Sequence, residues 1–417
     1  MKRITPSTVK GQVTAPPSKS MMGRALAAAY LAQGGTVITN PSFCDDALAI
    51  MGVIRTLGAV VQDNEESVTI GGAPRRPATP EALMLHCGES ALCMRIFAPI
   101  AALREQPIAL TASGSLQSRP MDMIEAIRVL GVSCKTTDGH APISIRGPMK
   151  GGFIGIDASV SSQFLTGLLL SLPLCEGDST ISAYSLKSLP YVRMTIGLLE
   201  HFGITVGHDE AFEEFEIRGS QSYAPIRYEV EGDWSGAAFL LVAGAFSGPV
   251  TVVGLDTDSP QADRAILEVL QEVGAHLEIG PDRITVKRGQ LKPFRFDVTD
   301  CPDLFPPLAA LAVHCDGRTI ISGIERLRHK ESNRLAALSL ELGNLGGTMR
   351  STASSVEIDG GGIRGGTADA HGDHRIAMAC AVAGLSAEHE VTIEGPSCVS
   401  KSYPRFFSDL EALQVKP

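Results

Sequence analysis

Six short polar segments, each just before an apolar stretch, carry most of the residues that could take part in chemistry. The segments are Ser18-Lys19-Ser20, Gly88-Glu89-Ser90, Ser161-Ser162-Gln163, Asp233-Trp234-Ser235, Cys301-Pro302-Asp303 and Asp373-His374-Arg375. If the apolar stretches are helices, the segments lie where four backbone N–H groups lack partners and the helix dipole attracts anions. A Ser or Asp at such a position also caps a helix, so each segment taken alone favours a structural role.

Cations occur in and just after these segments and in a second set of loops farther along the chain, each before a second helical run. They are Lys19, Arg24, Arg95, Arg119, Arg334, Arg375 and Lys401. Arg offers a planar bidentate fork and Lys a mobile point charge, so together they suit ligands that carry several phosphate and carboxylate groups. Two carboxylates, Asp303 and Glu331, lie among them. These either balance the positive charge or act as general acid and base, and the pattern leaves both interpretations open.

A repeat of about 72 residues predicts that these segments lie on a common rim. Helical runs that end in an apolar residue and Gly recur at intervals of 71 to 73 residues. The glycines are Gly58, Gly131, Gly203, Gly274 and Gly346. Over 417 residues this period gives six units, and equivalent loops of a repeated unit meet on one side. An open binding solenoid is the alternative, but solenoid repeats usually have only about 20 to 50 residues.

The first helix of each unit is apolar on nearly every side, as in Ala25–Ala32 and Ala237–Phe246. Such helices are buried, whereas the alternating strands predict sheets with one face in water. The second helices, such as Asp122–Leu130, are amphipathic and lie on a surface. We therefore predict a two-domain inside-out α/β barrel. It has six βαβαββ repeats, three per domain, with the helices buried and the sheets outside.

The domain boundaries follow from the size that one core can support. We expect a discontinuous domain of residues 1–16 and 231–417 and a second domain of residues 17–230, with the active site in the cleft between them. The initial strand, expected over Ser7–Thr14, closes the discontinuous domain.

Composition excludes several classes of protein. With 44% hydrophobic and 20% charged residues, the chain is folded rather than disordered. A net charge of −10 argues against nucleic acid as a partner. Even a long stretch of apolar residues and Gly, such as Ala237–Phe246, is too short to span a membrane. Nine cysteines without a Cys-x-x-Cys pair indicate free thiols in a reducing compartment, so we expect a cytoplasmic protein.

The polar motifs resemble those of the 5-enolpyruvylshikimate-3-phosphate synthase family. In the family's order they are Pro17-Ser18-Lys19-Ser20 with Arg24-Ala25-Leu26, Ser161-Ser162-Gln163-Phe164-Leu165-Thr166, Pro302-Asp303, Arg328-His329-Lys330-Glu331-Ser332-Asn333-Arg334-Leu335, Asp373-His374-Arg375-Ile376-Ala377-Met378 and Ser400-Lys401-Ser402-Tyr403-Pro404. The resemblance implies transfer of the enolpyruvyl group of phosphoenolpyruvate to the 5-hydroxyl of shikimate 3-phosphate, with release of phosphate. It also implies two domains, each with three βαβαββ units.

The same resemblance implies roles for individual residues. Contacts to shikimate 3-phosphate correspond to Lys19, Ser20, Arg24, Ser161, Ser162, Gln163, Ser188, Asp303 and Lys330. Contacts to phosphoenolpyruvate correspond to Lys19, Ala91, Arg119, Gln163, Arg334, Arg375 and Lys401. Asp303 corresponds to the proton acceptor, and Glu331 with Lys19 to the groups that manage the proton at the methylene carbon. The family needs no metal or other cofactor. We expect a monomeric enzyme of aromatic amino acid biosynthesis.

The loop Gly88–Arg95 departs from the family pattern. Glu89 stands where Asn is usual, which leaves the polar contacts of this loop open. Ala91 stands where Gly is usual, and its methyl group predicts crowding of a phosphoenolpyruvate mimic longer than the substrate, such as glyphosate.

Two other functions are alternatives. The sister enzyme that acts on UDP-N-acetylglucosamine has a similar fold, but it usually has Lys-Asn where this chain has Lys19-Ser20. The double serine Ser161-Ser162 also favours shikimate 3-phosphate. A non-catalytic anion-binding protein is disfavoured because Lys19, Asp303 and Glu331 are all present.

Overall fold

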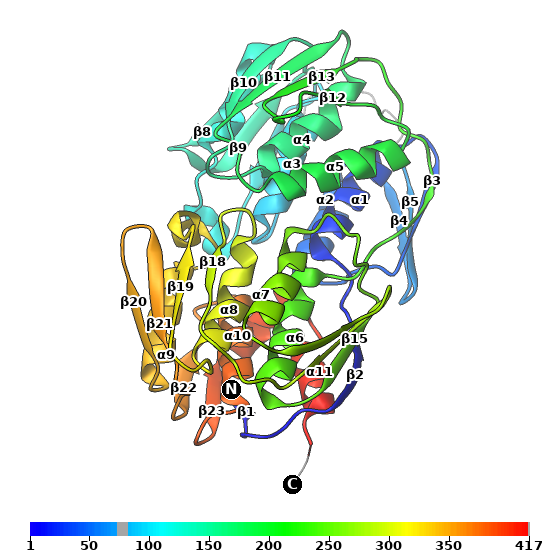
Figure 1. Ribbon diagram of the computed structural model, residues 1–417. Coiled ribbons are helices and arrows are strands. Elements are labelled where there is room, and N and C mark those ends of the chain that lie inside the picture. The colour runs from blue at the N-terminus through cyan, green and yellow to red at the C-terminus, as the bar shows by residue number, and fades with distance from the viewer. Residues whose placement is uncertain (73–81, 416–417) are drawn as a thin grey trace. The chain divides into compact units, whose positions relative to one another are not determined.

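The computed structural model describes residues 1–72 and 82–415. The chain divides into two compact units (Figure 1). Unit 1 comprises Met1–Ser18 and Glu231–Pro417, and unit 2 comprises Lys19–Val230. Within the described ranges, every helix is too short or too polar to cross a lipid bilayer.

The three sheets of unit 2 share one strand arrangement. Their orders are β14-β3-β5-β4, β6-β7-β9-β8 and β10-β11-β13-β12. In each sheet the first two strands are parallel and the other neighbours antiparallel. The strands are β3 (Gly35–Thr39), β4 (Val60–Asp63), β5 (Ser67–Gly71), β6 (Leu83–His86), β7 (Ile108–Thr111), β8 (Ser133–Thr137), β9 (His140–Arg146), β10 (Phe153–Asp157), β11 (Ser179–Tyr184), β12 (Gly207–His208), β13 (Glu214–Ile217) and β14 (Arg227–Glu229). The last of these returns to complete the first sheet, so unit 2 closes on itself.

Unit 1 repeats this arrangement with one shorter sheet. Its strand orders are β16-β17-β15-β2, β18-β19-β21-β20 and β1-β23-β22. The strands are β1 (Lys2–Ile4), β2 (Gly11–Thr14), β15 (Val250–Val253), β16 (His276–Ile279), β17 (Arg283–Lys287), β18 (Arg295–Asp297), β19 (Arg318–Ser322), β20 (Thr348–Ser351), β21 (Ser355–Asp359), β22 (Gly366–Asp369) and β23 (Val391–Glu394).

The N-terminal segment corrects the prediction of one strand over Ser7–Thr14. Strand β2 pairs in parallel with β15, whereas β1 pairs antiparallel with β23. It is therefore β1 that completes the last repeat, while β2 begins the fourth. Between them, the N–H of Ser7 donates to Leu385 O and that of Val9 to Ser247 O. These backbone N–H groups bond to carbonyls at helix ends instead of to a neighbouring strand. The predicted strand is therefore interrupted between β1 and β2.

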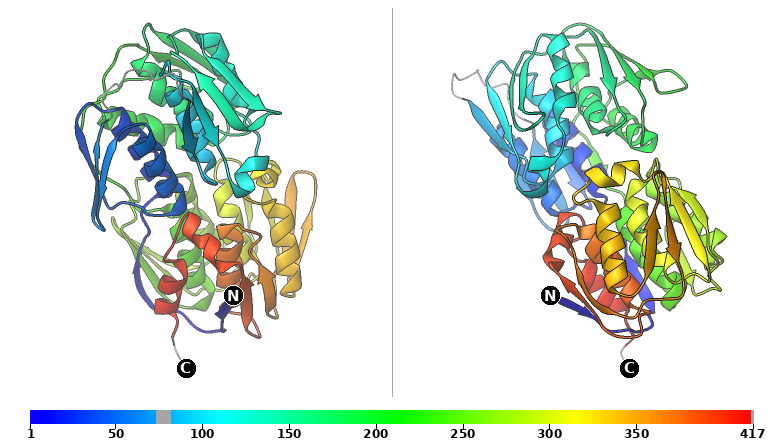
Figure 2. Two further views of the ribbon diagram at one scale, coloured as in Figure 1. Left: turned by 180° about the vertical axis from the view of Figure 1, so that it is seen from behind. Right: turned by 90° about the vertical axis from the view of Figure 1, so that its left-hand side faces the viewer.

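Three helices form the centre of each unit, and the sheets surround them (Figure 2). They are α1 (Lys19–Leu31), α3 (Ala91–Ala101) and α4 (Gln163–Ser171) in unit 2, and α6 (Trp234–Ser247), α8 (Phe305–Ala312) and α10 (His374–Gly384) in unit 1. Nearly all their residues are buried. Each fully buried large apolar side chain contributes about 1.5–3 kcal/mol relative to exposure. The observed layers are the inside-out arrangement predicted from the apolar runs.

The second helices are more polar and mostly α-helical. They are α2 (Asp45–Thr56), α5 (Leu189–His201), α7 (Ile266–Glu272), α9 (Arg334–Asn344) and α11 (Phe406–Leu413). The 3₁₀ helices are η1 (Gly114–Ser118), η2 (Asp122–Leu130), η3 (Leu172–Leu174), η4 (Ala262–Ala265), η5 (Pro302–Leu304), η6 (Glu325–His329) and η7 (Pro396–Lys401). In η2 the buried residues Ile124, Ile127 and Leu130 are three apart, which fits three residues per turn.

His314, just after α8, makes the stability of unit 1 depend on pH. Its Nε2 lies 3.0 Å from Ala383 O, and burial lowers its pKa from 6.5 to about 4. Between these values the unfolded chain binds more protons, so stability falls as pH falls. A His314→Gln variant retains an N–H donor but does not titrate. Between pH 7 and 4.5 the unfolding free energy of this variant should fall by about 2 kcal/mol less than that of the wild-type protein. Urea unfolding measures this, and equal losses in both proteins would contradict it.

Candidate active site

Arg24 is a buried cation on α1 of unit 2 that is held only by neutral groups. Its side chain donates from Nε to Thr195 Oγ1 at 2.9 Å and from Nη1 to Ser20 O at 2.9 Å. Nη2 donates to Tyr191 O at 3.2 Å and to Thr166 Oγ1 at 3.4 Å. No carboxylate of the described residues forms an ion pair with it. Burial lowers its pKa to about 10, so it remains charged at neutral pH. An anionic ligand would offset the cost of this buried charge.

Thr166 and Thr195 orient Arg24, although sequence analysis did not predict a role for them. Their hydroxyls lie 3.2 Å apart. They also donate to Ser162 O at 3.3 Å and to Tyr191 O at 2.9 Å. The available signal was clear only for Thr166, a hydroxyl within the buried and otherwise mostly apolar α4, because such a group needs a nearby partner.

Lys19 and Ser20 lie beside Arg24 in the first turn of α1. The Lys19 Nζ is 3.2 Å from Asp46 Oδ2, and only 13% and 7% of these two side chains are exposed. Asp46 belongs to the first turn of α2, where the helix dipole also stabilises a carboxylate. The structure thus brings Lys19, Ser20 and Arg24 together at one helix start.

The starts of α4 and α5 present serines with different roles. Ser161 Oγ accepts the N–H of Gln163 at 3.2 Å. Ser162 is buried, but its hydroxyl does not cap α4. Ser188 precedes α5 with φ 59°, a left-handed conformation that is uncommon for serine, and its hydroxyl does not cap that helix. Gln163 Oε1 accepts from Arg95 Nη1 at 3.0 Å. Hydroxyls and N–H groups at two helix starts suit a phosphate group.

Two side chains, those of Arg95 and Glu89, hold the loop that carries Arg119 through hydrogen bonds. Arg95 Nη2 donates to Pro120 O at 3.0 Å. Glu89 Oε2 accepts from the N–H of Ser115 at 3.2 Å and from its hydroxyl at 3.0 Å. The Glu89 carboxylate therefore anchors η1, the turn just before Arg119, and Arg119 itself is buried.

In unit 1, Arg334 binds three carboxylates. Its Nε donates to Asp373 Oδ2 at 2.8 Å and its Nη1 to Asp303 Oδ1 at 2.7 Å. Its Nη2 donates to Glu331 Oε2 at 2.7 Å. Asp373 is completely buried and also caps α10 by accepting the N–H of Arg375 at 3.0 Å. A guanidinium with all its edges engaged holds the carboxylates in fixed positions.

Asp303 contacts three cations. Besides Arg334, it accepts from Arg375 Nη2 at 3.0 Å and lies 3.9 Å from Lys330 Nζ. Burial raises the pKa of Asp303, but Arg375, Lys330 and Arg334 outweigh burial and hold the pKa well below its ordinary value. Burial in turn lowers the pKa of Lys330 to about 8, although Asp303 raises it in part. Asp303 is thus ionised and remains a weak base while these cations hold it.

The remaining predicted contacts lie at other helix ends. Ala91 begins α3 in unit 2, and Lys401 ends η7 in unit 1 next to α10; both are buried. All nine cysteines are free thiols, as predicted, and eight of them are buried. Among the residues that the structure describes, no group of three or more His, Cys, Asp or Glu could hold a metal ion.

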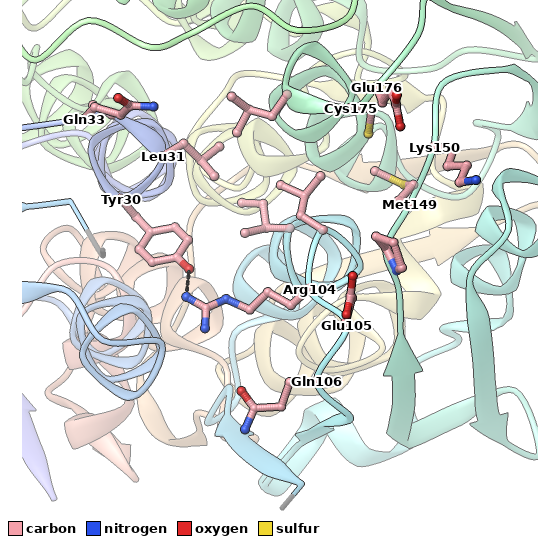
Figure 3. A pocket seen from close by; sticks show the side chains of 15 residues that line it. Tyr30, Leu31, Gln33, Arg104, Glu105, Gln106, Met149, Lys150, Cys175 and Glu176 are labelled. Atoms are coloured by element: carbon pink, nitrogen blue, oxygen red, sulfur yellow. Dashed lines mark hydrogen bonds between the residues drawn. The ribbon is translucent and has the colours of Figure 1, made fainter. Parts of the chain in front are cut away.

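A cavity of about 590 Å³ lies at the opposite ends of the same helices of unit 2 (Figure 3). Tyr30 and Leu31 of α1 and Ile100 of α3 line it, and Arg104 donates to the Tyr30 hydroxyl at 2.9 Å. Along an α-helix, Tyr30 is about 15 Å from the first turn. None of the predicted site residues is among its described lining residues. This cavity is therefore separate from the candidate site.

The two clusters suit different tasks. The cluster of unit 2 combines buried cations with hydroxyl and N–H donors, which is typical of phosphate binding. The cluster of unit 1 combines three cations with several carboxylates, so it can bind an anion and move a proton.

The matching family model and the curated relatives carry the same enzyme name. A family model described as EPSP synthase (3-phosphoshikimate 1-carboxyvinyltransferase) matches residues 4–410. The 3-phosphoshikimate 1-carboxyvinyltransferase of Methanocella arvoryzae is 40% identical over 422 aligned positions, which cover 99% of each chain. The protein of that name from Clostridium kluyveri is 38% identical over 413 residues, which cover 98% of this chain and 96% of the relative.

Solved structures confirm the predicted fold class. An EPSP synthase from Acinetobacter baumannii has a TM-score of 0.83 and 26% identity, and the match covers 99% of this chain and 98% of that one. An enolpyruvyl transferase from Streptomyces tendae has a TM-score of 0.80 and 19% identity over 99% of this chain and 96% of that one, a likeness that concerns the fold alone.

Proposed function

The chain belongs to the EPSP synthase (3-phosphoshikimate 1-carboxyvinyltransferase) family, and from this membership we infer its reaction. It transfers the enolpyruvyl group of phosphoenolpyruvate to the 5-hydroxyl of shikimate 3-phosphate and releases phosphate. It is therefore a transferase of the shikimate pathway, which leads to the aromatic amino acids.

The observation that best supports an anionic substrate is the state of Arg24. It is 1% exposed, charged, and without a carboxylate partner among the described residues. We propose that the carboxylate of shikimate 3-phosphate supplies the missing negative partner, while Ser161, Ser162 and Ser188 hold its phosphate. Lys19, Ser20, Gln163, Asp303 and Lys330 complete the proposed contacts to this substrate.

Phosphoenolpyruvate has a carboxylate and a phosphate, so it needs several cations of its own. We assign these to Lys19, Arg119, Arg334, Arg375 and Lys401, with Gln163 and Ala91 beside them. Residues of both units must then reach the same pair of substrates. We therefore propose that the two clusters act as one site, in which the cations hold mutually repelling anions together and reduce the entropic cost of their encounter.

The hydrogen bonds from Arg334 and Arg375 to Asp303, together called the clamp on Asp303, imply how this base is activated. In the structure, Arg375 and Arg334 bind both oxygens of its carboxylate. When the anionic substrate attracts these guanidinium groups, their hold on Asp303 weakens and its pKa rises. Asp303 then accepts the proton of the 5-hydroxyl more readily. The base would thus gain strength only when the electrophile is present.

The chemistry has two stages. The 5-hydroxyl oxygen bonds to C2 of phosphoenolpyruvate, Asp303 takes the hydroxyl proton, and C3 gains a proton to become a methyl group. The tetrahedral intermediate then loses phosphate from C2 and a proton from C3, which restores the methylene group. We propose that Glu331 and Lys19 manage the proton at C3, and that the arginine and lysine side chains stabilise the charge that develops.

A phosphate-release assay tests this function. We expect release from phosphoenolpyruvate with shikimate 3-phosphate and none with UDP-N-acetylglucosamine. Release only with the nucleotide sugar would identify the sister enzyme, and release with neither would identify a non-catalytic anion-binding protein. The family match and the identities of 38–40% favour the first outcome.

Lys330 makes the binding of shikimate 3-phosphate depend on pH. Because its pKa is about 8, its positive charge is present below this value and lost above it. We expect the Kd for shikimate 3-phosphate, measured by calorimetry, to rise about tenfold from pH 7 to 9.5. In the Lys330→Arg variant the side chain stays charged, so most of this rise should disappear. The same rise in both proteins would assign it to another group.

A further inference from the structure

Asp263, on η4 of unit 1, has no role in the reaction described above. It is 1% exposed, and its Oδ2 accepts the hydroxyl of Ser235. Its Oδ1 is also buried and has no hydrogen-bond partner among the described residues. Within the same part of the chain, Arg375 Nε is likewise buried and without a hydrogen-bond partner. A fully buried carboxyl with so few partners is unusual, because an ionised one would normally be paired.

The charges around Asp263 come from three other elements. At the start of α6 it faces Ser235 and the capping residue Asp233, and from α10 it faces Arg375. From η5 it faces Asp303 and influences the Cys301 thiol. Burial first, and then the negative charge of Asp303, raise the pKa of Asp263 to about 7, while Arg375 and Ser235 lower it in part. Burial likewise raises the pKa of Cys301, so that thiol stays neutral.

We propose that Asp263 is a positioning residue whose neutral form near Arg375 leaves the positive charge of Arg375 uncompensated for the carboxylate or phosphate of phosphoenolpyruvate. This proposal rests on the function proposed above. Arg375 already donates to Asp303 through Nη2. An ionised Asp263 would add a second negative charge to the same guanidinium and repel the substrate. A neutral carboxyl fills the polar position without that repulsion.

The proposal predicts how substrate affinity changes with pH. As Asp263 ionises between about pH 6 and 8, the KM for phosphoenolpyruvate at saturating shikimate 3-phosphate should rise by about fivefold beyond the effect of substrate ionisation. Asp263→Asn stays neutral, so this additional rise should vanish. Ser235→Ala removes a hydrogen bond that favours the ionised form, so the rise should move to higher pH. The exposed Asp282→Asn serves as a matched control and should behave like the wild type.

A second measurement separates this proposal from the proposed function. The ¹³C-carboxyl resonance of Asp263 is assigned by its absence from the spectrum of Asp263→Asn. In the wild-type protein its chemical shift should titrate near pH 7. If the wild type does not turn over the two substrates, the proposed function fails, whatever this resonance shows. If turnover is normal but the KM of Asp263→Asn rises with pH as in the wild type, or if the resonance titrates near pH 4, Asp263 has no such role.

Discussion

Replacement of Glu331 by glutamine is expected to lower kcat about 10³-fold while the protein stays folded. The amide oxygen of glutamine can still accept the hydrogen bond that Arg334 Nη2 donates at 2.7 Å. The local geometry is thereby retained, but the side chain can no longer give or take a proton at C3 of phosphoenolpyruvate. Steady-state phosphate release measures kcat, and circular dichroism reports the fold.

A matched control for this variant lies six residues earlier. Glu325, the first residue of η6, is exposed, and Glu325→Gln removes the same charge. We expect its kcat to stay within about twofold of the wild type, because an exposed charge is well screened. A normal kcat for Glu331→Gln would show that this carboxylate only balances charge, the interpretation that the sequence leaves open.

Replacement of Arg24 by methionine is expected to weaken the binding of shikimate 3-phosphate by about 100-fold and yet to stabilise the protein. A charged group that is buried without a counter-ion opposes folding, so its removal should raise the unfolding free energy by about 1 kcal/mol. The hydroxyls left behind keep partners, because Thr166 and Thr195 can each donate to a main-chain carbonyl. Calorimetry measures the affinity, and thermal unfolding measures the stability.

The exposed Arg218 of unit 2 provides the comparison. Arg218→Met should change neither property, since its guanidinium is solvated. A less stable Arg24→Met protein that binds the substrate normally would show that Arg24 serves to hold α1, α4 and α5 together, and that the substrate carboxylate is bound elsewhere.

The sequence predicted the fold well because the fold depends on local patterns. The 72-residue period and the runs apolar on every side determine which helices are buried, and both are visible without coordinates. The division of Ser7–Thr14 was not predictable, since the partners of this segment, β15 and β23, lie more than 230 residues away. Likewise, a buried spacing of three residues in η2 looks helical but does not by itself distinguish a 3₁₀ helix from an α-helix.

The sequence predicted which residues belong to the site, but not most of the interactions that hold them in place. Helix-start position and charge identified Arg24, Asp303, Arg334 and Arg375. Their partners depend on packing between helices, so neither the threonines around Arg24 nor the clamp on Asp303 follows from spacing. The orphaned oxygen of Asp263 is a further case, because an Asp after a strand usually reads as a cap or a turn residue.

The routing of the chain has a consequence for biosynthesis. Unit 2 is a single contiguous stretch, Lys19–Val230, whose sheets receive all their strands from within it. It can therefore reach its native state on the ribosome once that stretch has emerged. Residues 1–18 must wait, because β2 needs β15 and β1 needs β23, and both of these strands follow unit 2 in the chain. A segment that is synthesised before unit 2 is thus incorporated only after it.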